Sequence, residues 1–308
     1  MRIISWQEKF HIMDRTAVAI GKFDGVHRGH HKLLEEILKA HDDGLKSAVF
    51  TFEPAEDLSF KMADEKVLTT RNEKREILSQ MGIDILIEFP LNDRTAAISP
   101  EDFIAEYIRD SLNAALVVAG PDLSYGYKGS GDFQLLKSMQ NICRFETRMI
   151  DKVFYEREAI SSTRIRNSMN DSNMNLVNSM LGRPYFIGGK VKHGKQLGRT
   201  MGFPTVNLDV PSEKMLPQNG VYYSNARIDG KKYPSITNIG TRPTVDENNI
   251  INVETFIFGF SGQIYDENIF IDLLEYKRAE RKFETLDLLK AELEKDFTDG
   301  MKFHGIAE

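Results

Sequence analysis

The chain has 308 residues, of which 41% are hydrophobic and 28% charged, and its net charge is −6. At roughly 150 residues per domain this length predicts about two domains, and the ordinary composition excludes a disordered or fibrous chain. The acidic balance argues against a general nucleic-acid surface, which would normally be basic. Because no apolar run resembles a signal peptide or a membrane span, and the single Cys143 cannot form an internal disulfide, we expect a cytoplasmic protein without nucleic-acid or membrane partners. Self-association is left open.

The first half of the chain alternates strand and helix patterns. Strands are predicted at 16–23, 46–52, 83–89 and 114–120, with helices at 31–40, 72–82 and 100–112. Such alternation predicts a Rossmann-like α/β domain, a parallel sheet with helices on both faces. Ligands of such sheets bind beyond the carboxyl ends of the strands, where the loops 21–30 and 119–132 fall.

The second half of the chain has a different composition and a different pattern of predicted elements. Residues 167–179 are rich in Asn and Ser, so we predict a first domain over 1–168, a linker over 169–181 and a second domain over 182–308. Short β-rich runs at 188–194, 220–240 and 251–262 precede a helix at 284–297. This pattern predicts an antiparallel β-barrel with one covering helix. A core stripe is predicted on that helix from Leu286, Leu288, Leu289 and Leu293.

The segment GKFDGVHRGH, residues 21–30, is a candidate phosphate site at the start of a helix. Its glycines, Gly21, Gly25 and Gly29, permit close backbone approach, and the helix start presents free N–H groups. His27 and His30 can donate to oxygens that gain charge during phosphoryl chemistry. The alternatives are a glycine-rich turn with surface histidines, and a zinc pair, which the missing helical spacing and third ligand disfavour.

A second candidate element is ISSTRIR, residues 160–166. Hydroxyls at a helix start, followed by arginine, can bind a polyphosphate, although an ordinary N-cap with solvated arginines is the alternative. In combination, GKFDGVHRGH and ISSTRIR resemble the nucleotidyltransferase superfamily and the amino-terminal module of prokaryotic FAD synthetases.

This resemblance implies that the FMN phosphate attacks the α-phosphorus of ATP, which yields FAD and pyrophosphate. His27, His30 and Arg164 would be catalytic. The implied ATP-binding residues are Gly21, Phe23, Asp24, Gly25, Gly29, Ser161, Ser162 and Thr163, and the implied FMN-binding residues are Asp122 and Tyr125. The chain departs from the family at EPAED, residues 53–57, where an Asp-Pro-His-Pro run is common, and at Leu123 and Tyr125, which replace two phenylalanines.

The segment GKQLGRTMGFPTVN, residues 194–207, is a candidate kinase loop. Three glycines permit close backbone approach to phosphate and two cations add positive charge: Gly194, Gly198, Gly202, Lys195 and Arg199. The side-chain oxygens of Thr205 and Asn207 can reach Mg²⁺. The alternative is a β-turn between strands. Phosphorylation of an alcohol requires removal of a proton, and Glu254 in an apolar strand is the candidate base, unless strand alternation simply turns it toward solvent.

Riboflavin kinases contain, in the same order, segments similar to GRTMGFPTVN, NGVYY at 219–223, NIGTRPT at 238–244, VETFIF at 253–258 and KRAERKFETLDLL at 277–289. The resemblance spans nearly all of 182–297. It implies that Thr205 and Asn207 bind Mg²⁺ and nucleotide phosphates, and that Glu254 deprotonates the ribityl 5′-hydroxyl. Further implied positions are the substrate-rim residues Asn238, Gly240, Thr241 and Arg242, and the flavin-side residues Arg278 and Phe283.

Both halves together imply that riboflavin and ATP give FMN and ADP, and that FMN and ATP then give FAD and pyrophosphate, each step with Mg²⁺. The alternatives are a monofunctional enzyme, supported by the departures at EPAED and DLSYGY, and a non-catalytic regulator that senses flavin or nucleotide. A nucleotidyltransferase for another substrate would leave the second domain unexplained.

Overall fold

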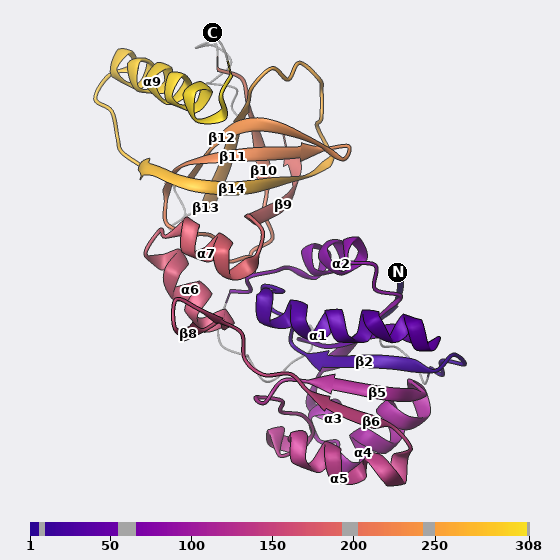
Figure 1. The fold of residues 1–308 in the computed structure, drawn as a ribbon. Helices are drawn as coiled ribbons and strands as arrows, with labels where there is room; N and C mark the ends of the chain where they lie inside the picture. Colours follow the sequence, from indigo (N-terminus) through magenta and orange to yellow (C-terminus); the bar gives the residue numbers. More distant parts are fainter. Residues whose placement is uncertain (6–9, 55–65, 193–202, 243–249, 307–308) are drawn as a thin grey trace. The chain divides into compact units, whose positions relative to one another are not determined.

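The computed structural model describes residues 1–5, 10–54, 66–192, 203–242 and 250–306. The chain forms two compact units, Met1–Ser161 and Ser162–Glu308 (Figure 1). This division falls earlier in the chain than the predicted boundary after residue 168. Each unit has its own sheet and its own core.

The segment predicted as a linker, 169–181, is largely helical. Helix α6 (Ser162–Asn170) runs into it, and α7 (Met174–Leu181) occupies its second half. Asn173 caps α7 by accepting a hydrogen bond from the Leu176 N–H at 3.1 Å. The buried residues of α7 are Met174, Val177, Met180 and Leu181. The Asn and Ser composition of this region therefore reflects helix capping and an exposed helix face as well as the connection between domains.

The first unit is built on a six-stranded parallel sheet of order β1-β4-β3-β2-β5-β6, which confirms the predicted α/β class. The strands are β1 (Arg2–Ser5), β2 (Thr16–Gly21), β3 (Lys46–Pro54), β4 (Ile85–Leu91), β5 (Ala114–Ala119) and β6 (Glu146–Met149). The two edge strands, β1 and β6, have four residues each and are mostly exposed. Sequence patterning missed them because a short edge strand carries no run of buried apolar residues.

Helices cover both faces of this sheet (Figure 1). On one face lie α1 (Arg28–Lys39) and α2 (Arg71–Gln80), and on the other α4 (Pro100–Asp102), the π-helical η2 (Phe103–Ser111) and α5 (Phe133–Cys143). The three predicted helices are present, the third being π-helical for most of its length. The short elements are η1 (Ala40–Asp43), α3 (Asp93–Ala96), η3 (Tyr127–Gly129), β7 (Phe154–Tyr155) and β8 (Glu158–Ala159).

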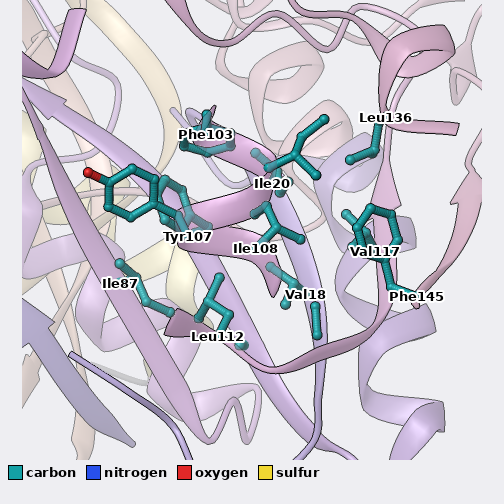
Figure 2. Close-up of a cluster of buried hydrophobic side chains, with 14 of the residues drawn as sticks. Val18, Ile20, Ile87, Phe103, Tyr107, Ile108, Leu112, Val117, Leu136 and Phe145 are labelled. Carbon is teal, nitrogen blue, oxygen red and sulfur yellow. The ribbon is translucent and has the colours of Figure 1, made fainter. Parts of the chain in front are cut away.

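Figure 2 shows the core between the sheet and the layer of η2 and α5. The labelled side chains are Val18, Ile20, Ile87, Phe103, Tyr107, Ile108, Leu112, Val117, Leu136 and Phe145. Residues between them in the strands, such as Ala17 and Val49, are equally buried on the opposite face. Full burial of each large side chain stabilises the fold by about 1.5–3 kcal/mol. The packed core therefore fixes the strand ends from which the loops extend.

The second unit is a closed antiparallel barrel of order β10-β13-β12-β11-β14-β9 with a carboxy-terminal helix, as predicted. Its elements are β9 (Tyr185–Lys192), β10 (Thr205–Asp209), β11 (Gly220–Ile228), β12 (Lys231–Arg242), β13 (Ile250–Ile257), β14 (Asn268–Ala279) and α9 (Leu286–His304). Buried hydroxyls link neighbouring strands: Ser224 contacts Thr237 at 2.8 Å, and Thr237 contacts Thr255 at 2.9 Å. Because strand neighbours alternate, Glu254 faces the side of the sheet opposite to Thr255.

Helix α9 packs on the barrel by a different stripe from the predicted one. The predicted leucine stripe is wrong for Leu286 and Leu288, which are 72% and 54% exposed, whereas Leu289 and Leu293 are half-buried. The packed residues come later in the chain: Phe297, Met301 and Ile306 lie against Val221, Ile236 and Phe258. The side of α9 that faces the barrel also carries Asp296, which pairs with Lys277 and Arg278 of β14 at 2.8 and 2.5 Å.

The docking of α9 should weaken in acid. Burial lowers the pKa of His304 below its ordinary value of 6.5, and the hydrogen bond that its ring donates to the Ser235 carbonyl offsets this only in part. Near pH 6.5 the unfolded chain therefore binds more protons than the folded chain. The free energy of unfolding has its full value above pH 6.5 and decreases as the pH falls from there toward the lowered pKa of His304. Urea unfolding of wild type and His304→Gln at several pH values measures this. We expect a shallower pH dependence in the variant, and identical curves would contradict the assignment.

Candidate active sites

The loop between β2 and α1 is wound tightly at the carboxyl end of β2. Phe23 and Val26 have φ values of 50° and 39°, and Gly25 has 82°. Such angles are unfavourable for side chains other than glycine, above all for a β-branched valine. Both Phe23 and Val26 are fully buried. The local strain is therefore held in place by packing, a pattern that is common where backbone must approach a ligand.

Thr69, which precedes α2, and side chains of α2 and β3 also hold this loop. The Thr69 N–H donates to Asp24 Oδ1 at 3.1 Å, and the Gly25 N–H donates to Thr69 Oγ1 at 3.0 Å. Lys74 donates to the Lys22 carbonyl at 3.1 Å and to Glu53 at 2.5 Å. Asp24, a predicted ATP contact, thus anchors the loop.

His27 and His30 lie together at the start of α1. His27 is the N-cap residue, and its Nδ1 accepts the His30 N–H at 3.4 Å. The two rings stack with centroids 3.8 Å apart, and Phe23 contacts the His30 ring at 5.1 Å. A Cβ on Gly29 would lie 3.0 Å from the His27 ring, a tight contact that this glycine avoids. Two imidazoles and the positive end of α1 therefore gather where a phosphate can bind.

Removal of the buried Lys74 ammonium should disturb this loop selectively. The side chains of Lys74 and Glu53 are only 7% and 10% exposed, and loss of one partner of a buried pair costs about 3–5 kcal/mol. We expect Lys74→Met to lower stability and raise the KM for ATP in FAD formation, with FMN formation unchanged. The double variant Lys74→Met/Glu53→Leu should recover stability, as measured by urea unfolding. Equal stability of Lys74→Met and wild type would contradict the role given to the pair.

The predicted flavin loop places its two candidate residues differently. Asp122 is at the surface, where its carboxylate pairs with Lys152 at 2.7 Å. Tyr125 is 3% exposed, contacts Phe103 at 5.2 Å and donates to the Asp132 carbonyl at 3.3 Å. Burial raises the pKa of Tyr125. In this conformation the Tyr125 ring supports the loop from inside the core, and Asp122 is the residue open to a ligand.

The segment ISSTRIR lies at the division between the units. Ser161 is the last residue of the first unit, and Ser162, Thr163 and Arg164 form the first turn of α6 in the second. Thr163 is exposed, and Arg164 is half-buried. The resemblance implies an ATP-binding role for this segment, and that role stays a prediction.

In the barrel, three neighbouring strands align polar residues of the predicted kinase site. Asn207 of β10 is directly opposite Glu254 of β13, and Glu254 is directly opposite Asn238 of β12. Residues opposite each other in antiparallel strands share a face. Thr205, two residues before Asn207, has the same orientation and is opposite Phe256. One face of the barrel therefore presents a carboxylate between two amides, with a hydroxyl beside them.

The environment of Glu254 includes a residue that the sequence analysis did not single out. Asn252 Nδ2 donates to Glu254 Oε1 at 2.7 Å. Five predicted phosphate residues of the kinase loop lie outside the described residues: Gly194, Lys195, Gly198, Arg199 and Gly202. The side chains of the predicted rim residues Thr241 and Arg242 also lie outside the description.

An aromatic cluster borders this polar row. The Phe256 ring lies 6.1 Å from Phe203 and 5.4 Å from Phe297 of α9, and Phe203 lies 5.8 Å from Phe297. This cluster was not predicted, because its three rings come from separate parts of the chain and meet only in the folded barrel. Rings of this kind offer a planar ligand an apolar surface.

Arg278 and Phe283, predicted near the flavin, have local contacts. Arg278 pairs with Asp296 and with Glu292, at 3.2 Å for the latter, and so ties β14 to α9. Phe283 is half-buried, with the Arg281 guanidinium 5.5 Å from its ring centroid. Direct contact of either residue with flavin stays a prediction.

Two negative findings concern the described part of the chain. Its His, Cys, Asp and Glu side chains form no group of three or more that could hold a metal ion. Among its helices, none has the length and apolar character needed to cross a membrane.

A helix start suited to phosphate on a parallel sheet, followed by a barrel that aligns a carboxylate with amide and hydroxyl oxygens, is typical of enzymes that handle nucleotide phosphates. The sequence model of the FAD synthetase family matches residues 9–164, and that of the riboflavin kinase family matches residues 181–304. The chain belongs to the family of bifunctional riboflavin kinases/FMN adenylyltransferases.

Curated relatives of that description align over nearly the whole chain. The protein of Listeria monocytogenes is 35% identical over 93% of this chain and 91% of the relative, and that of Bacillus subtilis is 33% identical over 94% and 92%. A solved structure described as a macrolide-efflux protein from Streptococcus pneumoniae is 29% identical, with a TM-score of 0.86 over 97% of this chain and 98% of that one. This structural similarity supports the fold, and the description as an efflux protein applies to the Streptococcus pneumoniae structure alone.

Proposed function

We propose that the barrel phosphorylates riboflavin to FMN, and that the first domain transfers the adenylyl group of ATP to FMN to form FAD. Family membership supports both activities. The observation that carries the kinase assignment is the register that sets Asn207 opposite Glu254, with Thr205 on the same face. We keep the domain boundaries 1–168 and 182–308, and a cytoplasmic enzyme, as predictions.

In the kinase step, a Glu254 carboxylate oxygen accepts the proton of the ribityl 5′-hydroxyl. The hydroxyl oxygen then forms a bond to the γ-phosphorus of ATP, the bond to the β,γ-bridging oxygen breaks, and ADP leaves. The aromatic cluster of Phe203, Phe256 and Phe297 is suited to the isoalloxazine ring, because it offers an apolar surface next to the polar row.

The donor set of the barrel fits Mg²⁺. A threonine hydroxyl and an asparagine carbonyl are hard, neutral oxygens, and Mg²⁺ in nucleotide sites takes few protein ligands beside phosphates and water. Thr205 and Asn207 would hold it. When bound, the ion neutralises charge on the phosphate oxygens.

In the adenylyl step, an oxygen of the FMN phosphate forms a bond to the α-phosphorus of ATP, and pyrophosphate leaves. An FMN phosphate is already ionised near neutral pH, so this reaction needs alignment and charge stabilisation more than a base. His27, His30 and the N-terminus of α1 are suited to that task, because both rings are held at the helix start. Glu53 belongs to the EPAED segment, where the chain departs from the family pattern. Its carboxylate pairs with Lys74, which supports the loop between β2 and α1.

The test is chromatography of products after incubation of the purified protein with Mg-ATP and either riboflavin or FMN, in separate reactions. We expect FMN in the first and FAD in the second. FMN without FAD would favour the monofunctional kinase, and no product in either reaction would favour the regulator.

A further inference from the structure

Asn252 is placed to act on Glu254. The two residues are two positions apart on β13, so their side chains share a face of the barrel. The amide of Asn252 donates to Glu254 Oε1 at 2.7 Å, and Asn252 is only 9% exposed. A buried amide is costly unless it is hydrogen-bonded. The bond to Glu254 therefore couples the orientation of the carboxylate to a side chain that is itself held by burial.

The cross-strand neighbour of Asn252 is Gly240 of β12, which has no side chain. The space beside Gly240 holds the Glu280 carboxylate, which a Cβ at this position would meet. The bond joins two residues of one strand. Asn252 differs in this respect from Asn207 and Asn238, which approach Glu254 from neighbouring strands.

An amide is chemically suited to orient a general base. It donates a hydrogen bond that restricts the carboxylate to one rotamer, yet it carries no charge. A lysine or arginine in its place would form a charge-assisted bond and compete with the substrate hydroxyl for the carboxylate. With Oε1 engaged by Asn252, the direction of the second carboxylate oxygen is restricted, as alignment with the ribityl hydroxyl requires.

We propose that Asn252 is a positioning residue for the kinase reaction, which orients Glu254 for proton transfer from the 5′-hydroxyl of riboflavin. This inference rests on the proposed function of Glu254 as the base. Asn252 acts through Glu254 and needs no contact with either substrate.

The test compares Asn252→Val with Asn252→Thr. Valine and threonine have nearly the same shape and both favour strands, but only threonine can donate a hydrogen bond. We expect Asn252→Val to lower the kcat of FMN formation about ten-fold or more, which is a small part of the 10²–10⁴-fold that a general base contributes. The KM values for riboflavin and ATP should stay within about two-fold of wild type. Asn252→Thr should recover much of the loss. Wild-type kcat in Asn252→Val, or equal loss in both variants, would overturn the proposal.

A double-mutant cycle with Glu254→Gln separates positioning from a structural effect. If Asn252 acts through Glu254, Asn252→Val should cause little further loss once the carboxylate is gone. The same fold-loss in both backgrounds would overturn the positioning role. Urea unfolding of each variant reports whether the barrel, which has its own core, is folded. If Glu254→Gln retains the wild-type kcat, Glu254 is not the base, and the proposed role of Asn252 is refuted as well. If Glu254→Gln is inactive but Asn252→Val has the wild-type kcat, only the role of Asn252 is refuted.

Discussion

Replacement of Glu254 by glutamine is expected to lower the kcat of FMN formation by about 10²–10⁴-fold, the usual contribution of a general base. The amide keeps the size of the side chain and can still face Asn207 and Asn238 across the strands, but it cannot accept the ribityl proton. FAD formation from supplied FMN should be unchanged, because the FMN phosphate needs no base. Separate assays of the two products measure both effects.

The matched control for this substitution is Glu267→Gln. Glu267 is an exposed acid just before β14 of the same barrel, so its neutralisation changes the net charge equally and should leave both activities intact. Normal FMN production by Glu254→Gln would remove Glu254 from the mechanism. Loss of both activities would indicate misfolding, which urea unfolding can detect.

Replacement of His30 by alanine is expected to lower the kcat of FAD formation by about 10²–10³-fold, the usual effect of removing one donor to a developing charge. FMN formation should be retained, because His30 belongs to the first unit. His30→Phe retains a ring that can stack on His27, so it removes the donor while preserving the contact at 3.8 Å. We expect the same loss in this variant.

The control for the histidine variants is His11→Ala, an exposed histidine of the same unit whose ring contacts the Asp110 carbonyl. Its FAD formation should match wild type. Full activity of His30→Phe, beside a defective His30→Ala, would mean that ring stacking and not hydrogen-bond donation is what FAD formation requires of this residue.

The strands and helices that sequence patterning found are those with long apolar runs. β2, β3, β4 and β5 are central strands, buried on both faces, and their continuous hydrophobic character is visible along the chain. The exposed edge strands β1 and β6 lack that signal. The barrel class was predictable for a similar reason, since alternating strands and turn residues recur through residues 185–279.

The candidate site was predictable only as far as single residues and short motifs reveal chemistry. Glu254 stood out as a carboxylate in an apolar strand, and the glycines and histidines of residues 21–30 stood out by their types and spacing. The Asn252 amide, by contrast, is unremarkable in the sequence and gains a role only through its bond to Glu254. Lys74 lies 21 positions from Glu53 along the chain, and their pairing depends on how α2 packs beside β3.

The sequence by itself predicted the two fold classes and a candidate phosphate site at residues 21–30, because apolar periodicity and residue chemistry are local properties. Its resemblance to riboflavin kinases implied Glu254 as the base. Only the tertiary structure decided which stripe of α9 meets the barrel, that Tyr125 lies in the core, and that Asn207, Glu254 and Asn238 form one row. These outcomes depend on strand register and helix docking. Both are set by contacts between residues far apart in the chain, which no local pattern records.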